Sequence, residues 1–241
     1  MAGKSETPLV VKGKRIDGRK ANELRKMTAE VGIIPQADGS AKFSMGETVA
    51  IAGVYGPKEV LPKHQTKDDR ALIRVYYSML PFSTTDRCRP GPSRRSKEIS
   101  KVMIDALEAA VITEKYPATA IEIHVQILNA NAGTRTAAIN AASLALANAG
   151  IEMRDLVCAV ASGKADDTVL LDLFQPEDNF GQADLPIAVM PNREEITLVQ
   201  MDGDLSSKEF DESMKLVMDS AMEIYDVQKA ALIVGKKENK K

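Results

Sequence analysis

The feature that most constrains the fold lies in the middle of the chain, where a two-residue hydrophobic period gives way to a helical one. Apolar side chains at every second position from Ile121 to Ile127 alternate with polar ones, which predicts a strand with one buried face. The turn NANAGTR follows, and an Ala-rich segment over 134–149 predicts a helix that ends at Gly150. The alanines leave room for a neighbouring element to pack closely, so this part of the chain must set a helix against a sheet.

Similar elements occur on both sides of this unit. Alternating or β-branched segments predict strands over 28–33, 41–45, 48–55, 72–80, 157–162, 168–174, 184–190 and 196–201. We expect the first four to form an antiparallel meander. Another helix is predicted between the segment PSRR and Pro117, and a last one from the capping box Ser206–Glu209 through Tyr225. Strands followed by helices, twice, predict an α+β domain in two similar halves.

Composition narrows the functional classes. Hydrophobic residues make up 44% and charged residues 27% of the 241 residues, as in ordinary folded proteins. Aromatic residues are only 4% and Trp is absent, which argues against nucleic-acid binding by base stacking on aromatic platforms. The formal net charge is −2, so a site for a polyanion must be a local cluster.

The remaining general features predict a soluble cytoplasmic protein. Cys88 and Cys158 are too few for a disulfide framework or a zinc site, and free thiols fit a reducing cytoplasm. There is no signal-peptide core and no apolar run of about 18 residues, so we expect no contact with a membrane. Residues 1–14 and the basic segment 235–241 are predicted to be loose tails around a folded domain over 15–234.

Four arginines within nine positions form the first candidate site. Arg94 and Arg95 fall in the first turn of a predicted helix with Ser93 as its N-cap, where the helix dipole disfavours cations. An anion bound there would offset this cost, and guanidinium groups suit phosphate oxygens. Arg87 and Arg89 precede them in the loop. A solvated basic loop is the alternative.

The turn Asn129–Arg135 forms the second candidate site. Backbone N–H groups at a helix N-terminus, the flexible Gly133, the hydroxyl of Thr134 and the guanidinium of Arg135 together could hold an anion. The spacing matches neither the Walker A loop nor the dinucleotide fingerprint. An ordinary turn whose Thr134 caps the helix is the alternative.

A pair of aspartates forms the third candidate site. Asp184 opens a predicted strand, and Asp178 is expected in the loop before it. Two such carboxylates can bind a divalent cation, or one can stay protonated as a general acid. Loop aspartates are more often turn formers, as we expect for Asp166 and Asp167. A phosphate site, a polyanion track and a carboxylate pair together suit phosphodiester chemistry.

The sequence resembles the RNase PH family over nearly its whole length, and most closely the catalytic ring subunits of archaeal exosomes. The likeness is carried by the blocks RIDGRKANELRK, PSRRSKEISK, NAGTRTAAINAASLALANAGI and EDNFGQADLPIA. It implies an RNase PH-type α+β fold of two mixed sheets with packed helices, similar to domain 2 of ribosomal protein S5. It also implies phosphate-dependent 3′→5′ degradation of single-stranded RNA to nucleoside diphosphates, a reaction that can run in reverse and extend RNA.

The resemblance assigns roles to residues of the three clusters. Gly133, Thr134 and Arg135 would hold the attacking phosphate, and Asp178 and Asp184 would act as acid or metal ligands. The RNA backbone would lie along Arg94 and Arg95, with Arg70, Arg87 and Arg89 extending the track. Related polynucleotide phosphorylases have a lysine two residues after the second aspartate, where this chain has Pro186. Their full metal site is therefore not expected, while Mg²⁺ on the two carboxylates stays open.

The resemblance also implies an assembly. Three copies of this chain would alternate with three copies of a non-catalytic RNase PH-type subunit in a hexameric ring, and RNA-binding cap proteins would dock on it. A silent ring subunit is the main rival interpretation, because such subunits lack the aspartates of this loop. A nucleotide-binding regulatory domain is a third interpretation, which lacks a standard nucleotide loop.

Overall fold

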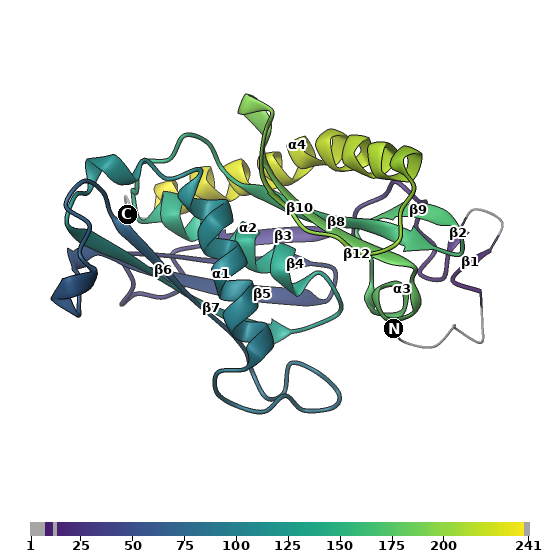
Figure 1. Cartoon of the computed structure of the whole chain (residues 1–241), viewed down its shortest axis with the longest axis horizontal. Helices are drawn as coiled ribbons and strands as arrows, with labels where there is room; N and C mark the ends of the chain where they lie inside the picture. Colours follow the sequence, from purple (N-terminus) through teal and green to yellow (C-terminus); the bar gives the residue numbers. More distant parts are fainter. Residues whose placement is uncertain (1–7, 12–13, 239–241) are drawn as a thin grey trace.

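The computed structural model describes residues 8–11 and 14–238 and shows two five-stranded sheets with helices packed between and over them (Figure 1). The first sheet has the order β3-β4-β5-β7-β6 and the second the order β11-β10-β8-β9, with β12 also paired to β10. The strands of the first sheet are β3 (Met27–Val31), β4 (Gly39–Met45), β5 (Thr48–Glu59), β6 (Leu72–Met79) and β7 (Thr119–Asn129). Those of the second are β8 (Cys158–Ala165), β9 (Thr168–Leu171), β10 (Ala183–Met190), β11 (Glu195–Val199) and β12 (Asp202–Gly203). The expected α+β class is confirmed.

The predicted meander of the first sheet is wrong at its last strand. β3, β4 and β5 are antiparallel neighbours, but β7 lies between β5 and β6 and pairs in parallel with β6. The chain between β6 and β7 contains helix α1 (Arg94–Glu108), and a parallel pair needs a crossover of that kind. The second sheet is antiparallel at every pairing within the described residues.

Helix α2 (Thr134–Asn148) packs between the two sheets, against β4 and β5 on one side and β8 on the other. Almost every residue from Thr134 to Leu146 is buried, which explains why this helix is rich in alanine and has no polar face. Gly39 of β4 shows how close the approach is, because a Cβ there would lie 2.3 Å from the backbone nitrogen of Ala149. The predicted close approach is confirmed.

Helix α4 (Ser207–Glu238) runs past both sheets, packing on β8 and on β3 (Figure 1). The predicted capping box is present, since the Ser206 backbone N–H donates to Glu209 Oε2 over 2.8 Å. The helix continues beyond Tyr225 because Gln228 and Ala231 are also buried. It therefore includes part of the expected C-terminal tail, of which residues 239–241 lie outside the described residues. None of the described helices is both long and apolar enough to span a membrane.

The packed part of the chain begins earlier than residue 15. Strand β1 (Val10–Val11) pairs with β2 (Lys14–Arg15), and Leu9 is buried. The backbone N–H groups of Leu9 and Val10 donate to Asp166 Oδ2 over 2.6 and 3.0 Å. Asp166 is thus a turn residue, as expected, and it also holds the N-terminal segment. Residues 1–7 and 12–13 of the expected N-terminal tail lie outside the described residues.

Candidate active site

A cavity of about 580 Å³ opens where α1, the turn before α2, and the start of β10 with its neighbour β12 meet. It brings together six of the residues singled out in the sequence, which come from four separate segments: Arg95, Gly133, Thr134, Arg135, Asp178 and Asp184. The cavity thus joins one arginine of the first cluster to the anion-binding turn and the aspartate pair.

The turn before α2 presents the uncapped end of a helix to the cavity. Gly133 is the N-cap residue in a left-handed conformation with φ of 62°, and among the described residues no side chain caps the helix. The hydroxyl of Thr134 is buried beside the hydroxyl of Tyr77 and does not cap the helix. The interpretation of Thr134 as an ordinary cap is therefore wrong. Free backbone N–H groups and a hydroxyl at a helix start suit an anion.

The aspartates Asp178 and Asp184 also line the cavity. Asp178 lies in the short helix α3 (Gln175–Phe180), where the sequence predicted a loop, and Asp184 lies at the start of β10. Desolvation and the neighbouring Asp178 carboxylate raise the pKa of Asp184 to about 7, while Arg135 and Arg95 oppose the shift. Desolvation also raises the pKa of Asp178, against the pull of Arg95, Arg135 and Arg25. One carboxyl of the pair can thus carry a proton near neutral pH.

Among the cavity residues that the sequence analysis missed are Glu98, Gln200 and Asp202. Glu98 accepts hydrogen bonds from Arg135 Nη2 over 3.2 Å and from Gln200 Nε2 over 3.0 Å. It follows Arg94 by one helical turn, so the helical period could have identified it. Asp202 faces Asp184 across the β10–β12 pairing and contributes to its raised pKa. Only the folded chain reveals that pairing.

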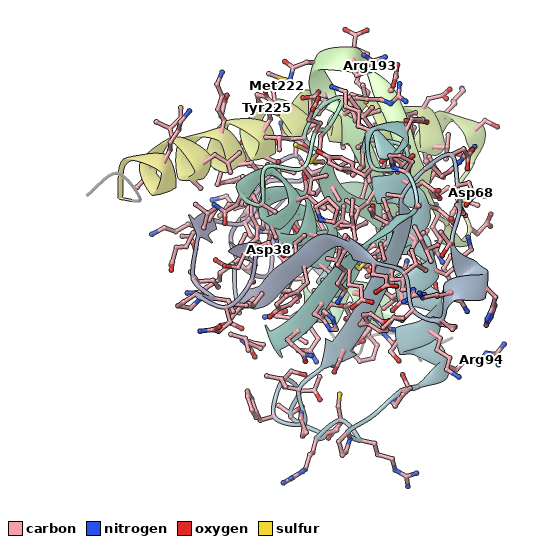
Figure 2. All side chains as sticks on the ribbon, turned by 90° about the vertical axis from the view of Figure 1, so that its left-hand side faces the viewer. Asp38, Asp68, Arg94, Arg193, Met222 and Tyr225 are labelled. Atoms are coloured by element: carbon pink, nitrogen blue, oxygen red, sulfur yellow. The ribbon has the colours of Figure 1, made fainter. Side chains whose placement is uncertain are left out.

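The other predicted arginines lie away from the cavity lining. Arg94 is exposed at the first position of α1 (Figure 2), and Arg87 and Arg89 are exposed in the loop before it. Ser93 caps this helix as expected, through a reciprocal pair of bonds with Ser96. Arg70 pairs with Asp69 and lies near Glu108 at the opposite end of α1. Within one chain, the structure does not bring Arg70 to the site.

The donor set can be tested against a divalent cation. Among residues 8–11 and 14–238, no three His, Cys, Asp or Glu side chains are grouped closely enough to hold a metal ion. Asp178 and Asp184 remain as a pair beside the anion-binding turn. Mg²⁺ is commonly held by one or two carboxylates together with substrate phosphates, so the pair fits that ion in a phosphate complex.

The chain is similar to known proteins over most of its length. The 3′ exoribonuclease family matches the chain in two parts, its domain 1 over residues 23–152 and its domain 2 over residues 155–220. The chain is 52% identical to the exosome complex component Rrp41 of Thermococcus onnurineus over 96% of its length and 94% of that protein. It is 47% identical to the Rrp41 of Nitrosopumilus maritimus over 96% of both.

Solved structures show the same fold. The Archaeoglobus fulgidus exosome with RNA bound to the active site gives a TM-score of 0.78 at 25% identity, over 88% of this chain and 92% of that one. Rice Rrp46 gives a TM-score of 0.81 at 23% identity, over 90% of this chain and all of that one.

Proposed function

This chain belongs to the RNase PH family of 3′ exoribonucleases, and from that premise we propose that it is the catalytic ring subunit of an archaeal-type exosome. It shortens single-stranded RNA from the 3′ end, using inorganic phosphate as the attacking group. One observation carries this proposal: an uncapped helix start shares one cavity with a carboxyl pair, one member of which has a pKa of about 7.

The residues of the cavity divide the reaction between them. Gly133, Thr134 and Arg135 seat the free phosphate through backbone N–H groups, a hydroxyl and a guanidinium. A phosphate oxygen attacks the last phosphodiester in line, the bond to the 3′ oxygen of the preceding nucleotide breaks, and a nucleoside diphosphate leaves. Asp184 in its protonated form donates a proton to that departing oxygen. Because one phosphorus–oxygen bond replaces another, the reaction also runs in reverse.

The negative charge of the phosphates is offset by the arginines and, when it is bound, by a metal ion. Arg95 faces the cavity and screens the phosphates at the reacting end of the RNA. Arg94, Arg89 and Arg87 extend from it along an exposed track, while Arg70 would contact RNA only on a path that continues past the far end of α1. Mg²⁺ is the alternative to the protonated Asp184: when bound, it would be held by Asp178 and Asp184 as carboxylates, would neutralise charge on the phosphates, and would supply the proton from a bound water.

The likeness to exosome components supports a role within an exosome. We propose that three copies alternate with three copies of a non-catalytic RNase PH-type subunit in a hexameric ring on which RNA-binding cap proteins dock. A cytoplasmic location fits the free thiols of Cys88 and Cys158. The rival role of a silent ring subunit is disfavoured, because Asp178, Asp184 and the uncapped turn occur together in one cavity.

A phosphate titration of Arg135→Ala tests the proposal. The chain assembled with its ring partner should degrade RNA with a phosphate KM at least tenfold higher than wild type, since the variant cannot form a charge-assisted hydrogen bond of about 1.5–3 kcal/mol. RNA affinity should stay within about twofold, because the arginine track at Arg94 and Arg95 is intact. An unchanged phosphate KM would remove Arg135 from the phosphate seat.

A further inference from the structure

The phosphate-binding turn and the helix that carries Asp178 belong to different halves of the chain, and their spacing must be held by something. The turn lies between β7 of the first sheet and α2, whereas α3 lies between β9 and β10 of the second sheet. We call the parts of the chain that carry the two sheets its two halves. A displacement of about 1 Å between reacting groups can cost roughly 100-fold in rate. The contacts that join these two segments therefore bear on catalysis.

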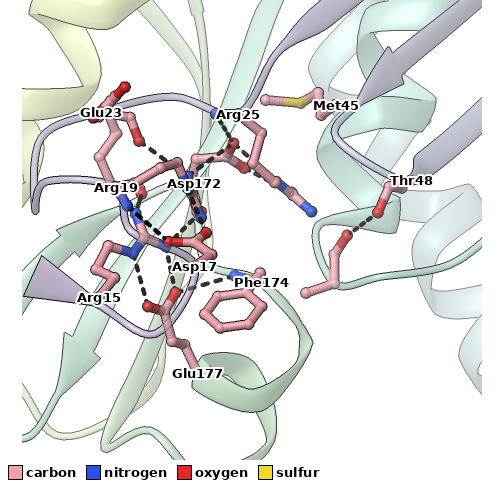
Figure 3. A network of polar contacts seen from close by, with 12 residues as sticks. Arg15, Asp17, Arg19, Glu23, Arg25, Met45, Thr48, Asp172, Phe174 and Glu177 are labelled. Carbon is pink, nitrogen blue, oxygen red and sulfur yellow. Dashed lines mark hydrogen bonds and ion pairs between the residues drawn. The ribbon is translucent and has the colours of Figure 1, made fainter. Parts of the chain in front are cut away.

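Arg25 makes the first connection. Its Nε and Nη2 donate to the two carboxylate oxygens of Asp172 over 3.0 and 2.7 Å, and its Nη1 donates to the carbonyl oxygen of Asn131 over 2.6 Å. The guanidinium lies directly against the turn, since a Cβ on Gly133 would be 3.0 Å from Arg25 Nη2. Arg25 and Asp172 are both buried. One planar group thus binds Asp172 of the second half (Figure 3) and, through its third nitrogen, Asn131 of the turn.

Asn131 makes the second connection. Its side-chain Oδ1 accepts the backbone N–H of Gln175, the first residue of α3, over 2.9 Å. Its Nδ2 donates to Glu47 Oε2 over 2.7 Å, and its backbone N–H donates to Thr48 Oγ1 over 3.0 Å. The hydroxyl of Thr48 in turn donates to the carbonyl of Ala132 over 2.7 Å. Asn131 therefore fixes the turn to the first sheet and caps the helix of the second half.

Both connections lead to α3, the helix that carries Asp178. Asp172 is separated from Gln175 by two residues, and Asp178 follows Gln175 by one turn of α3. On its other side α3 is anchored by the buried pair between Arg15 and Glu177 (Figure 3).

We propose that Arg25, Asp172 and Asn131 form an inter-half clamp, and that Arg25 and Asn131 are positioning residues that set the distance between the phosphate seat and the carboxyl pair. The clamp rests on the function proposed above. Neither residue faces the reacting atoms, so each acts through the segment that it holds. A lysine at position 25 keeps the charge but cannot bridge Asp172 and Asn131 with one planar fork.

The test compares Arg25→Lys and Asn131→Ala with Arg19→Lys in the full chain assembled with its ring partner. Arg19 is a matched control because it contacts Asp17 and Asp172 in the same cluster, and its hydrogen bonds in the described residues do not reach the turn or α3. Arg25→Lys and Asn131→Ala should each lower kcat/KM for phosphate by roughly 10–100-fold. Both variants should change kcat as well as KM and retain RNA affinity. The kcat/KM of Arg19→Lys for phosphate should stay within about threefold of the wild-type value.

Hydrogen–deuterium exchange of the full chain gives a readout that does not depend on the reaction. Arg25→Lys should speed exchange in residues 131–136 and 175–180 together, while Arg19→Lys should leave both segments protected as in wild type. Wild-type phosphate kinetics in Arg25→Lys and Asn131→Ala, or an equal loss in Arg19→Lys, would overturn the clamp. If wild type itself needs no phosphate, the proposed function fails, and the exchange measurement still decides the clamp.

Discussion

At the scale of single residues, Asp184 is distinguished within the cavity by its raised pKa. It is half-buried, has Asp178 and Asp202 as acidic neighbours, and keeps a pKa of about 7 despite the pull of Arg135 and Arg95. An acid with a pKa near the working pH is well suited to proton transfer, because its protonated form is populated and can still release the proton. The raised pKa therefore suits the general-acid role proposed above for Asp184.

Asp184→Asn should lower kcat by about 10²–10⁴-fold while RNA still binds, because the amide keeps the shape but cannot donate an acidic proton. The wild-type kcat should fall as pH rises through about 7, since the acid form is lost there, and the residual activity of the variant should lack that limb. The measurement is a pH series of kcat at saturating RNA and phosphate. A variant with normal turnover would show that the carboxyl has no catalytic role.

The same raised pKa affects stability. The folded state keeps a proton on Asp184 up to about pH 7, whereas the unfolded state loses it near the ordinary value of 3.8. The stability from this group is thus complete below pH 3.8 and is lost as pH rises through about 7. Asp184→Asn should therefore raise Tm by a few degrees at pH 8 and leave it unchanged near pH 4. For a protein of this size, each kcal/mol of unfolding free energy corresponds to about 2–4 °C in Tm. Equal shifts at both pH values would contradict this assignment.

The sequence predicted the residues that are close along the chain better than those joined by folding. The turn Gly133–Arg135, the aspartate pair and Arg95 were all found from local patterns, and the cavity brings them together. Asp202 and Arg25 were missed, because their relation to the site depends on the β10–β12 pairing and on a contact from Arg25 to Asn131, 106 positions away. No local period contains such information.

At the scale of elements, close backbone approach sets where the site groups lie. Gly163 of β8 is directly opposite Asp184 of β10, and a Cβ there would lie 2.2 Å from the carbonyl oxygen of Ala183. Gly39 makes an equally close approach to α2, but at the C-terminal end of that helix, away from the cavity. Substitutions at these two glycines can therefore distinguish an effect on packing from an effect on the site.

Gly163→Ala and Gly39→Ala should each destabilise the fold by about 1–3 kcal/mol, because the added methyl group forces backbone apart. Gly163→Ala should also lower kcat/KM for phosphate at a temperature where both variants are fully folded, since β10 carries Asp184. Thermal melts and phosphate kinetics measure the two effects. Equal kinetics in the two variants would show that the β8–β10 spacing does not control the carboxyl.

Local patterns predicted α2 well and α3 poorly. α2 has a long run of small residues that ends at Gly150, whose φ is 76°, so both its length and its end are coded locally. α3 has six residues and depends on Asn131 and Arg15 from distant segments. The predicted position of β6 was wrong for a similar reason, because the sequence of the strand does not indicate which neighbour it pairs with.

At the scale of the whole molecule, a net charge of −2 and a short arginine track limit what one chain can do with RNA. Replacing Arg94 and Arg95 together by alanine should weaken RNA binding and reduce the salt slope by about 0.7 for each phosphate of the single strand that the variant no longer neutralises. RNA affinity measured over a salt series checks this. An unchanged slope would mean that the two arginines are simply solvated.

Assembly should supply the rest of the track. The chain alone is expected to degrade RNA weakly. Addition of the proposed non-catalytic ring partner should raise activity strongly, if that partner lengthens the basic path for RNA as we propose. Activity assays on fractions from a sizing column test this. Full activity in the monomer fraction would exclude a requirement for the ring.

The central claim is that the cavity seats a free phosphate as the attacking group, and product analysis tests it most directly. The chain with its ring partner is incubated with single-stranded RNA in phosphate-free buffer and again with phosphate in the millimolar range. We predict that degradation stalls without phosphate and that nucleoside diphosphates accumulate when it is present. Release of nucleoside monophosphates without phosphate would contradict the account.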